Sequence, residues 1–488
     1  MPKINLVIDS QQVSAEAGSS ILEAARGAGI HIPTLCYIKE QDPKANCRIC
    51  LVEVEGRRGL LPSCATQVSP GMVVKTNTPA VRDARKMNLE LLISNHPMDC
   101  QHCARNGACD VNELSDEMCK YCIICDCTKD GACELQTLAR EYNAATGDFD
   151  WKERTEPLDD STHVIVKDPN KCILCTRCVA ACNDQQGIHV WSRTGRGAGS
   201  KILPAMNRPL AESACVRCGL CVKECPTAAL TMAQDHRDIF HYLDNKKLYK
   251  IARIEPSFIA ELSTLSGFDD LDLTPALMVS ALNKLGVNEI EPAVTAEKQA
   301  AEEIKAELAA ADGKPLIIRD SQPVVRMMKA RYPELADYFS KAGSGQETFF
   351  KTSTARDMEK EVYPITFTSS IGRKDEAREG GFGPEKAKVL TPLEIKHLFK
   401  RSAIELQVRR PDENYGPDLS TDDLLPAAAG IIEDQITVDG KTVKVLIAQG
   451  LRDVDTVLRK LKEGSCDYDL LQLEAVPGEA VDIRRMLV

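Results

Sequence analysis

Cysteine spacing constrains this chain more than any other feature of its sequence. All but one of its 21 cysteines lie from Cys36 to Cys225, and many neighbouring cysteines are separated by two, three or five intervening residues. Thiolates repeated at such short spacings in a long chain more often bind metal than form disulfides. The remaining cysteine, Cys466, stands alone in the second half. The sequence therefore predicts a metal-binding first half and a second half with a different role.

Length and charge narrow the class of protein. A chain of 488 residues, 43% of them apolar, can bury several cores. The formal net charge of −11 argues against a nucleic acid or an anionic membrane as the main partner. The N-terminus has no basic segment followed by an apolar run, and no stretch of about 18 apolar residues occurs. We expect a soluble, cytoplasmic protein without a membrane span.

Residue patterns divide the chain into four expected domains of α+β and α/β type. The first part alternates apolar and polar residues as strands do around one short helix, and the last part alternates amphipathic helices with short apolar strands. The glycine-rich, charged segment "GRKDEAREGGFGPEKAK" is expected to be a surface loop. The expected domain boundaries are 1–78, 79–148, 149–245 and 246–488.

The first cysteine group surrounds a central C-x2-C that precedes an apolar strand. Its members suit a 2Fe-2S cluster, with a structural zinc site as the alternative; they are Cys36, Cys47, Cys50 and Cys64. The segments "IPTLCY" and "GMVVKTNTP" around them resemble the N-terminal domain of the complex I large iron-sulfur subunit and of iron-only hydrogenases. The resemblance implies a β-grasp 2Fe-2S ferredoxin domain over residues 1–78.

The second group follows the pattern H-x3-C-x2-C-x5-C. It consists of His96, Cys100, Cys103 and Cys109. This order resembles the 4Fe-4S site with one histidine and three cysteine ligands of the same two families, which implies that His96 is the fourth ligand. A lone histidine is more often an ordinary surface or core residue, and we expect His102 to be a bystander.

The third group departs from the family pattern. It forms a cysteine-rich insertion whose end looks like a partial internal duplication of the second group, and it comprises Cys119, Cys122, Cys125, Cys127 and Cys133. The positions that correspond to His96 and Cys100 hold Lys120 and Ile124 in this copy, so it is not a second histidine-ligated site. Five thiols exceed the need of one cluster. We expect an additional cluster in the domain 79–148, with zinc or free thiols as alternatives.

The fourth group is the most specific, because it contains two C-x2-C-x2-C-x3-C runs. In two-cluster ferredoxins the fourth cysteine of each run binds the other cluster. That rule assigns one 4Fe-4S centre to Cys172, Cys175, Cys178 and Cys225. It assigns the second to Cys182, Cys215, Cys218 and Cys221. The domain 149–245 is therefore expected to be a two-cluster ferredoxin, with a linker that resembles those of iron-only hydrogenases and NAD-linked formate dehydrogenases.

The second half resembles, weakly but in order, the catalytic domain of iron-only hydrogenases. The segments "ARIEPSF" and "LTPALMVSALNKLGVNEIEPAV" correspond to its first strand and the helix and strand after it. That family holds its H-cluster with four cysteines in three motifs. In the first motif a cysteine pair gives way here to Asp320 and Ser321, placed to within about one residue. The second motif has Ser370, and the last has Val476 and Ala480 where cysteines would be. Oxygen and apolar side chains replace soft thiolates poorly. The domain 246–488 is thus expected to keep the fold without H-cluster ligands, as a docking surface or as an inert remnant.

Together these features predict an electron-relay subunit of an oxidoreductase complex with no substrate-converting site of its own. The expected cofactors are one 2Fe-2S cluster and three, with the insertion four, 4Fe-4S clusters. No G-x-G-x-x-G fingerprint after a strand and no P-loop occurs, so flavin and NAD(P) are expected on companion subunits, with soluble ferredoxin as a further candidate partner. The whole chain is similar to the relay subunit of Sporomusa-type electron-bifurcating transhydrogenases. A relay of an NAD-linked formate dehydrogenase or hydrogenase, or a non-redox iron-sulfur assembly scaffold, remains open.

Overall fold

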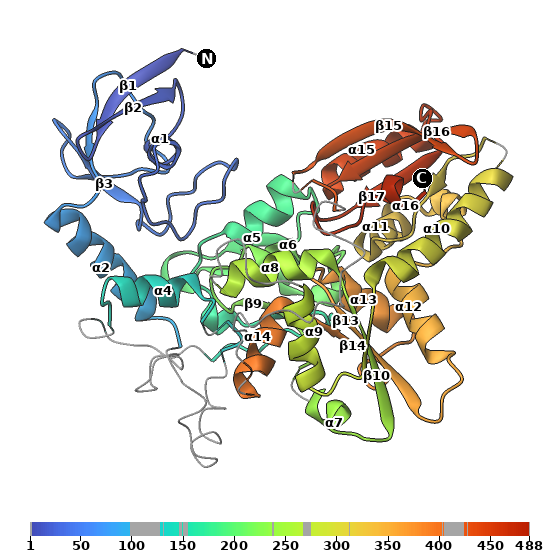
Figure 1. Cartoon of the computed structure of the whole chain (residues 1–488). Coiled ribbons are helices and arrows are strands. Elements are labelled where there is room, and N and C mark those ends of the chain that lie inside the picture. The colour runs from blue at the N-terminus through green and yellow to red at the C-terminus, as the bar shows by residue number, and fades with distance from the viewer. Residues whose placement is uncertain are drawn as a thin grey trace.

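The chain forms four packed modules, shown in Figure 1 as a computed structural model. The described residues are 2–97, 127–129, 131–145, 149, 155–236, 239–266, 275–311, 313–402, 404, 424–426 and 428–487. In the described part, no helix is both long and apolar enough to cross a membrane. The N-terminal module lies at the upper left of Figure 1, and helices α2 and α4 lie between it and the rest of the molecule.

The first module is a five-stranded sheet covered by one helix. The sheet has the order β2-β1-β5-β3-β4, in which β1 and β5 are parallel and the other pairs antiparallel. Its elements are β1 (Lys3–Ile8), β2 (Gln11–Glu16), α1 (Ile21–Gly27), β3 (Leu51–Val54), β4 (Leu60–Pro62) and β5 (Val73–Lys75). Ser20 and Glu23 form a capping box that starts α1. The expected β-grasp ferredoxin fold is confirmed.

Two helices follow and connect this sheet to the next module. They are α2 (Pro79–Ile93) and α4 (Glu134–Glu141). Thr78 caps α2, with Pro79 at the first helical position where its missing N–H costs nothing. Buried Arg85 on α2 donates to the carbonyl oxygen of Leu51 at 2.8 Å and to the hydroxyl of Tyr142 at 3.0 Å, which ties both helices to β3.

The third module repeats a short helix within each cysteine run. Its elements are β6 (Ile165–Lys167), α5 (Arg177–Ala180), β7 (Trp191–Thr194), β8 (Lys201–Pro204), α6 (Leu220–Lys223) and β9 (Leu230–Met232). The pairs β6–β9 and β7–β8 are antiparallel. Gly195 lies in the β7–β8 turn at φ 75°, where a Cβ would come within 2.4 Å of the carbonyl oxygen of Gly199, so only glycine fits.

The second half contains two sheets with helices on their faces. The first sheet is fully parallel, in the order β11-β10-β13-β14, and the second has the order β12-β17-β16-β15, with β15 antiparallel to β16. The strands are β10 (Leu248–Ile254), β11 (Glu289–Glu291), β12 (Leu316–Ile317), β13 (Glu361–Phe367), β14 (Lys388–Leu390), β15 (Gly430–Val438), β16 (Lys441–Gln449) and β17 (Leu470–Glu474). This confirms the expected α/β class.

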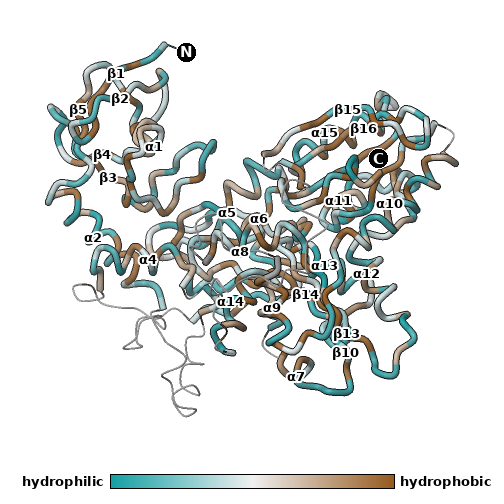
Figure 2. Tube along the Cα trace, viewed as in Figure 1, coloured by the Kyte–Doolittle hydropathy of each residue, from teal (hydrophilic) through white to brown (hydrophobic). Residues whose placement is uncertain are grey.

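Helices surround both sheets. They are α7 (Ile239–Leu243), α8 (Pro256–Ser266), α9 (Pro275–Lys284), α10 (Ala293–Ala310), α11 (Gln322–Arg331), α12 (Gly345–Thr354), α13 (Gly372–Glu379), α14 (Pro392–Arg401), α15 (Leu451–Lys462) and α16 (Ile483–Leu487). The hydrophobic residues of these elements gather inside the body of the molecule, as Figure 2 shows for the region around α9 and β14.

One expectation about the second half is wrong. The segment "GRKDEAREGGFGPEKAK" is not a surface loop, because it begins with helix α13, in which Arg373, Lys374 and Asp375 are all buried. The charges of this segment suggested that it was exposed, since charged side chains are almost never fully buried unless they are paired. Here each of the three side chains is paired with groups from distant parts of the chain.

The third module and the second half share one hydrophobic core. The largest buried cluster joins Val216 and Val222 beside the second cysteine run to Ile371, Leu451 and Val476 of the second half. Close packing of this kind means that the two parts are covered by each other rather than by solvent. The second half therefore forms part of the environment of the cysteine runs.

Candidate iron-sulfur centres

The first cysteine set lies in the loops between α1 and β3 and after β4. All four side chains are buried, and their thiols form two hydrogen-bonded pairs, Cys36 with Cys47 and Cys50 with Cys64. The structure thus brings together the four residues that the sequence pattern selected. Two pairs are the arrangement that two irons need when each is bound by two thiolates.

Hydrogen bonds prepare one sulfur of each pair for metal binding. The Cys47 thiol, helped by backbone N–H groups and opposed by burial, lowers the pKa of Cys36 to about 6. The Cys64 thiol, helped by the Ser63 hydroxyl and opposed by burial, lowers the pKa of Cys50 to about 6. The hydrogen bond that each partner thiol, Cys47 or Cys64, donates to its neighbour raises the pKa of that partner, and burial raises it further. Since the thiolate is the form that binds metal, the chemistry of this set fits a 2Fe-2S cluster.

His96 lies just after α2 and is only 5% exposed. Its Nδ1 is 2.7 Å from the carbonyl oxygen of Pro97, and because a carbonyl only accepts, Nδ1 carries the proton. In that tautomer Nε2 carries the lone pair that binds metals, and the Nδ1–H contact orients the ring. The three expected partner ligands, Cys100, Cys103 and Cys109, lie outside the described residues.

The cysteine-rich insertion is described only at its end. Cys119, Cys122 and Cys125 lie outside the described residues, whereas Cys127 and Cys133 are described and buried. The Cys133 thiol donates to the carbonyl oxygen of Pro226 at 3.5 Å, directly after the second ferredoxin run. Cys133 therefore lies against the two-cluster module, and the choice of four ligands among the five cysteines remains a prediction.

The first ferredoxin set surrounds one cavity. Cys172, Cys175 and Cys178 from the first run and Cys225 from the second line it together. This is the crossed combination that the ferredoxin rule selects. Burial is the main cause that raises the pKa values of Cys175 and Cys178. Buried thiols of this kind become thiolates when a metal cation compensates their charge, so the donor set fits a 4Fe-4S cluster.

The second ferredoxin set also combines both runs. Cys182 interacts electrostatically with Cys215, Cys218 and Cys221, which are themselves neighbours. Burial raises the pKa of Cys215 to about 11. The backbone N–H of Val190 donates to the sulfur of Cys182 at 3.3 Å, a contact of the kind that tunes cluster potentials. This set likewise fits a 4Fe-4S cluster.

In the part of the chain that the structure describes, no group of three or more His, Cys, Asp or Glu side chains is placed to hold one metal ion. The cavity between Cys172, Cys175, Cys178 and Cys225 has Trp191 and Lys167 in its wall as well as the four sulfurs.

The three described sets follow one another in space. Asn46, next to Cys47, donates to the hydroxyl of Thr176, next to Cys175, at 3.1 Å. Cys36, Cys47, Cys133 and Cys175 share one buried cluster. The first set therefore adjoins the Cys172 set, which adjoins the Cys182 set through the common core of the third module.

The end of this series is a cavity where the H-cluster ligands of the hydrogenase family were expected. Cys218 lines it together with the five residues aligned to those ligands, namely Asp320, Ser321, Ser370, Val476 and Ala480. They arrive from three segments: the start of α11, the end of β13 and the loop after β17. Cys218 is the only cysteine among the described residues that line it.

Charged side chains fill the surroundings of this cavity. Arg373 donates to the carbonyl oxygen of Asp320 at 3.0 Å and to its Oδ1 at 2.9 Å. The same guanidinium lies 3.0 Å from Glu376 and 3.3 Å from Glu255. Burial raises the pKa of Glu474, another lining residue, well above its usual range. The sequence did not predict this network, because its central residue, Arg373, lies in the segment expected to be a surface loop.

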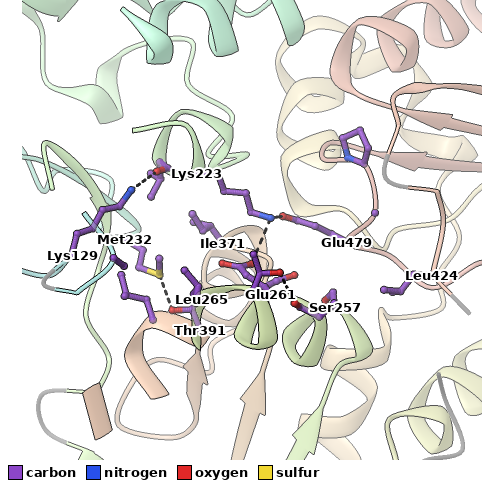
Figure 3. Close-up of a pocket in the computed structure, with 18 of the residues that line it drawn as sticks. Lys129, Lys223, Met232, Ser257, Glu261, Leu265, Ile371, Thr391, Leu424 and Glu479 are labelled. Carbon is purple, nitrogen blue, oxygen red and sulfur yellow. Dashed lines mark hydrogen bonds and ion pairs between the residues drawn. The ribbon is translucent and has the colours of Figure 1, made fainter. Parts of the chain in front are cut away.

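A larger cavity lies beside it, at the junction of the modules (Figure 3). Lys223 from α6 points toward Glu479 and Glu261, forming an ion pair with the first and lying 3.9 Å from the second. Lys129, between Cys127 and Cys133 of the cysteine-rich insertion, donates to the carbonyl oxygens of Val222 and Cys225. The ion pairs of α6 thus join the ferredoxin module to the second half.

Family models match each part of the chain. A 2Fe-2S iron-sulfur cluster binding domain matches residues 2–79, and the iron-sulfur binding region of NADH-ubiquinone oxidoreductase-G matches 85–119. A 4Fe-4S dicluster domain matches 171–229, and the C-terminal domain of the iron only hydrogenase large subunit matches 249–424. The fold and these matches define a multicluster iron-sulfur protein with one 2Fe-2S domain and several 4Fe-4S domains.

Relatives match either the whole chain or its first half. The NADP-reducing hydrogenase subunit HndD of Solidesulfovibrio fructosivorans is 30% identical, over 95% of this chain and 81% of that protein. The mitochondrial NADH-ubiquinone oxidoreductase 78 kDa subunit of Neurospora crassa is 35% identical over 47% of this chain and 27% of that protein. The NADPH-Fe(3+) oxidoreductase subunit alpha of Geobacter sulfurreducens is 33% identical over 46% of this chain and 24% of that protein. The chain belongs to the iron-only hydrogenase large-subunit family, with complex I-type iron-sulfur modules in its first half.

Proposed function

We propose that this chain is the electron-relay subunit of an NAD(P)-linked, electron-bifurcating transhydrogenase complex. In such a complex NADH, NADPH and ferredoxin exchange electrons through flavins on companion subunits. The observation that carries the proposal is a continuous series of cysteine sets that ends at a hydrogenase-like cavity lacking the hydrogenase cysteines. A chain that has a series of cluster sites, but lacks the H-cluster cysteines at the end of that series, suits a subunit that passes electrons between partner subunits.

The ligand sets expected from the cysteine spacing are part of this proposal. Cys36, Cys47, Cys50 and Cys64 hold the 2Fe-2S cluster, and His96 with Cys100, Cys103 and Cys109 hold a 4Fe-4S cluster. Two further 4Fe-4S clusters are held by the sets around Cys172 and Cys182 described above. When bound, these clusters accept and release single electrons. The chain itself fixes their spacing, buries the sulfurs and supplies N–H donors to them.

We assign no substrate-converting site to the chain. Asp320, Ser321 and Ser370 present oxygen atoms, and Val476 and Ala480 present alkyl groups, where soft thiolates are needed for iron-sulfur ligation. The guanidinium of Arg373 already bonds Asp320 at this place. The second half then serves to cover the Cys182 set and to present a docking surface for the flavin-containing partners.

A relay role in a hydrogenase complex is the second candidate. It is favoured by the match to HndD, which is named as a subunit of an NADP-reducing hydrogenase and which this chain covers to 81%. A relay of a formate dehydrogenase remains an alternative. An iron-sulfur assembly scaffold is disfavoured, because it has no need for the β-grasp and histidine-containing modules.

Two measurements test the proposal. The native complex, purified without oxygen, should contain flavoproteins that bind NAD(P). It should oxidise NADPH while NAD+ and ferredoxin are reduced together, or run this reaction in reverse. A molybdopterin subunit would instead indicate formate dehydrogenase. The chain, co-expressed with an H-cluster maturation system, should neither evolve nor oxidise hydrogen. A known iron-only hydrogenase matured in parallel is the control that the system works, and hydrogen turnover by this chain would overturn the proposal.

A further inference from the structure

Two buried side chains lie between the ferredoxin cysteine sets and have no part in the ligand pattern. Lys167, at the end of β6, is 6% exposed, and Trp191, at the start of β7, is 2% exposed. The Lys167 ammonium lies over the Trp191 ring, 5.4 Å from its centroid. Both line the cavity of the Cys172 set. A buried cation stacked on a buried indole is therefore part of the wall of one candidate cluster site.

Trp191 reaches both sets. Its ring lines the cavity surrounded by Cys172, Cys175, Cys178 and Cys225, and its side chain forms a hydrogen bond with Cys221 of the other set. Because the indole nitrogen only donates, the bond runs from N–H to sulfur. One side chain thus spans the space between the two candidate clusters.

The charges around the two sets differ. Lys167 lines the cavity of the first set and interacts electrostatically with Cys172 and Cys178, as well as with the carboxylates of Asp159 and Glu156. Arg217 interacts with Cys215 of the second set, but its Nη1 lies 2.6 Å from Oδ1 of buried Asp375, so its charge is countered. A further carboxylate, Glu479, interacts with Cys218. The first set therefore faces an ammonium group, whereas the second faces compensated or negative groups.

A second cation near the first set, Arg177, is neutralised by carboxylates. Arg177 interacts with Cys175, but its guanidinium is bound to Glu134 at 2.7 Å and to Glu224 at 3.0 Å. Two carboxylates more than offset its single positive charge. Lys129 also lies close to this set, where it donates to the carbonyl oxygens of Val222 and Cys225. Lys167 is the cation that lines the cavity itself, and the asymmetry between the sets is therefore assigned to it.

We propose that Lys167 and Trp191 set the reduction potentials of the two ferredoxin centres separately, with the centre of the Cys172 set the higher of the two. Adding an electron makes a cluster more negative, so a nearby ammonium stabilises the reduced form of the first centre. The N–H bond to Cys221 acts in the same direction on the second centre alone. An electron leaving the Cys182 centre then reduces the Cys172 centre without bond or proton changes.

This order directs electrons away from the hydrogenase-like cavity. Cys218 of the second set lines that cavity, whereas Thr176, within the first set, bonds Asn46 of the N-terminal module. Electrons therefore collect on the side of the 2Fe-2S module. The inference rests on the proposed ligand sets for these two centres.

Redox titration followed by electron paramagnetic resonance tests the proposal on the full-length, anaerobically prepared protein. The signals of the two ferredoxin centres are distinguished from those of the other clusters by their disturbance in Cys172→Ser and Cys182→Ser, which also tests the ligand sets. Lys167→Met and Lys167→Gln should both lower the potential of the Cys172 centre only, and Lys167→Arg should keep it. Trp191→Phe, which keeps an aromatic ring and removes the N–H donor, should lower the potential of the Cys182 centre only.

The matched control is Lys201→Met. Lys201 lies in the same module and is paired with Glu156 on the surface, so its loss should shift neither centre. Iron content is measured for every variant, and retention of iron by either neutral Lys167 variant is sufficient for the comparison. Loss of iron in both neutral variants, with Lys167→Arg retaining it, would make Lys167 structural and overturn the proposal. It would also be overturned if Lys167→Arg shifted the potential as much as Lys167→Met, or if both positions shifted the same centre.

Discussion

Single buried charges govern the region where the hydrogenase family binds its H-cluster. Arg373 is 8% exposed and contacts oxygen atoms of Asp320, Glu376 and Glu255. Burying a charge is costly unless it is paired, so this arginine compensates carboxylates that would otherwise be unfavourable. The cavity at this position is stabilised by ion pairs of its lining residues, such as that between Arg373 and Asp320.

Arg373→Met should destabilise the protein by about 3–5 kcal/mol, because it removes a cationic partner from buried Glu255 and from half-buried Asp320 and Glu376. Denaturant unfolding of the anaerobically prepared protein measures this loss. Arg356→Met is the matched control: Arg356 also bonds two carboxylates, Glu289 and Glu291, but at a more exposed place, and should cost about 1 kcal/mol or less. Equal losses in the two variants would contradict a buried network at the cavity.

His96→Cys should retain a 4Fe-4S centre and lower its potential. An anionic thiolate would replace a neutral imidazole that the contact to Pro97 holds in its Nδ1–H form, and greater negative charge disfavours reduction. Redox titration with spectroscopic detection of that centre provides the measurement. An unchanged signal and potential would show that His96 is not a ligand.

At the scale of elements, helix α13 connects the second half to the ferredoxin module. Lys374 bonds Asp235 at 2.9 Å, beyond the last cysteine run, and Glu394 at 2.9 Å on α14. Asp375 bonds Arg217, which lies between two proposed ligands. Arg378 bonds Asp235 at 3.0 Å as well. Successive charged residues of one short helix thus attach it to separate modules.

Lys374→Met should destabilise the protein by about 3–5 kcal/mol at pH 8, since it removes the ammonium partner of buried Glu394 and one of the two cationic partners of buried Asp235. Lys386→Met, which removes an exposed amine from the following loop, is the control and should have little effect. Denaturant unfolding at matched protein and salt concentrations compares the two variants. A loss in Lys374→Met no greater than in the control would contradict the buried role.

The same variant should show a pH dependence. Burial opposes ionisation of Glu394, but Lys374 and His236 outweigh it and lower its pKa to about 2. A depressed pKa contributes stability that is present above the ordinary carboxyl pKa and is lost as the pH falls toward 2. Without Lys374, burial raises the pKa of Glu394. At pH 5 the carboxyl group of Glu394 should then take up a proton, which reduces the free-energy cost of burying it in the Lys374→Met variant. The stability gap to wild type should therefore be narrower at pH 5 than at pH 8.

At the scale of the whole molecule, the cysteine runs and the second half share a core. Val216 and Val222 pack in the same cluster as Ile371 and Val476. In addition, a Cβ on Gly219 would lie 2.7 Å from the side chain of Ile371, which shows how closely the segment after Cys218 approaches the second half. The second half is thus a structural wall of the second ferredoxin site as well as a proposed docking surface.

The purified full-length chain should contain iron and sulfide for one 2Fe-2S and at least three 4Fe-4S centres. Cys182→Ser should disturb one 4Fe-4S signal, because serine oxygen replaces a thiolate poorly. Cys466→Ser is the control and should leave the iron content unchanged, since Cys466 lies apart from the proposed ligand sets. Metal analysis and spectroscopy give the result. Zinc as the main metal, or iron for one cluster only, would contradict the proposal.

The sequence alone predicted the module types and the grouping of the cysteines. Ligands such as Cys172, Cys175 and Cys178 are brought together by a few residues of backbone, so their spacing carries the geometry. The positions aligned to H-cluster ligands were also predictable, because Ser370 and Val476 lie in segments whose order along the chain follows the family.

Only the tertiary structure decided how buried charges are paired. The burial of Arg373, Lys374 and Asp375 depends on partners from 20 to 158 residues away, and nothing in "GRKDEAREGG" marks it. The contact of Lys167 on β6 with Trp191 on β7 depends likewise on how two separate strand pairs, β6–β9 and β7–β8, pack together. Local spacing can specify a ligand set, but the electrostatic environment of that set sums over groups that meet only when distant segments pack.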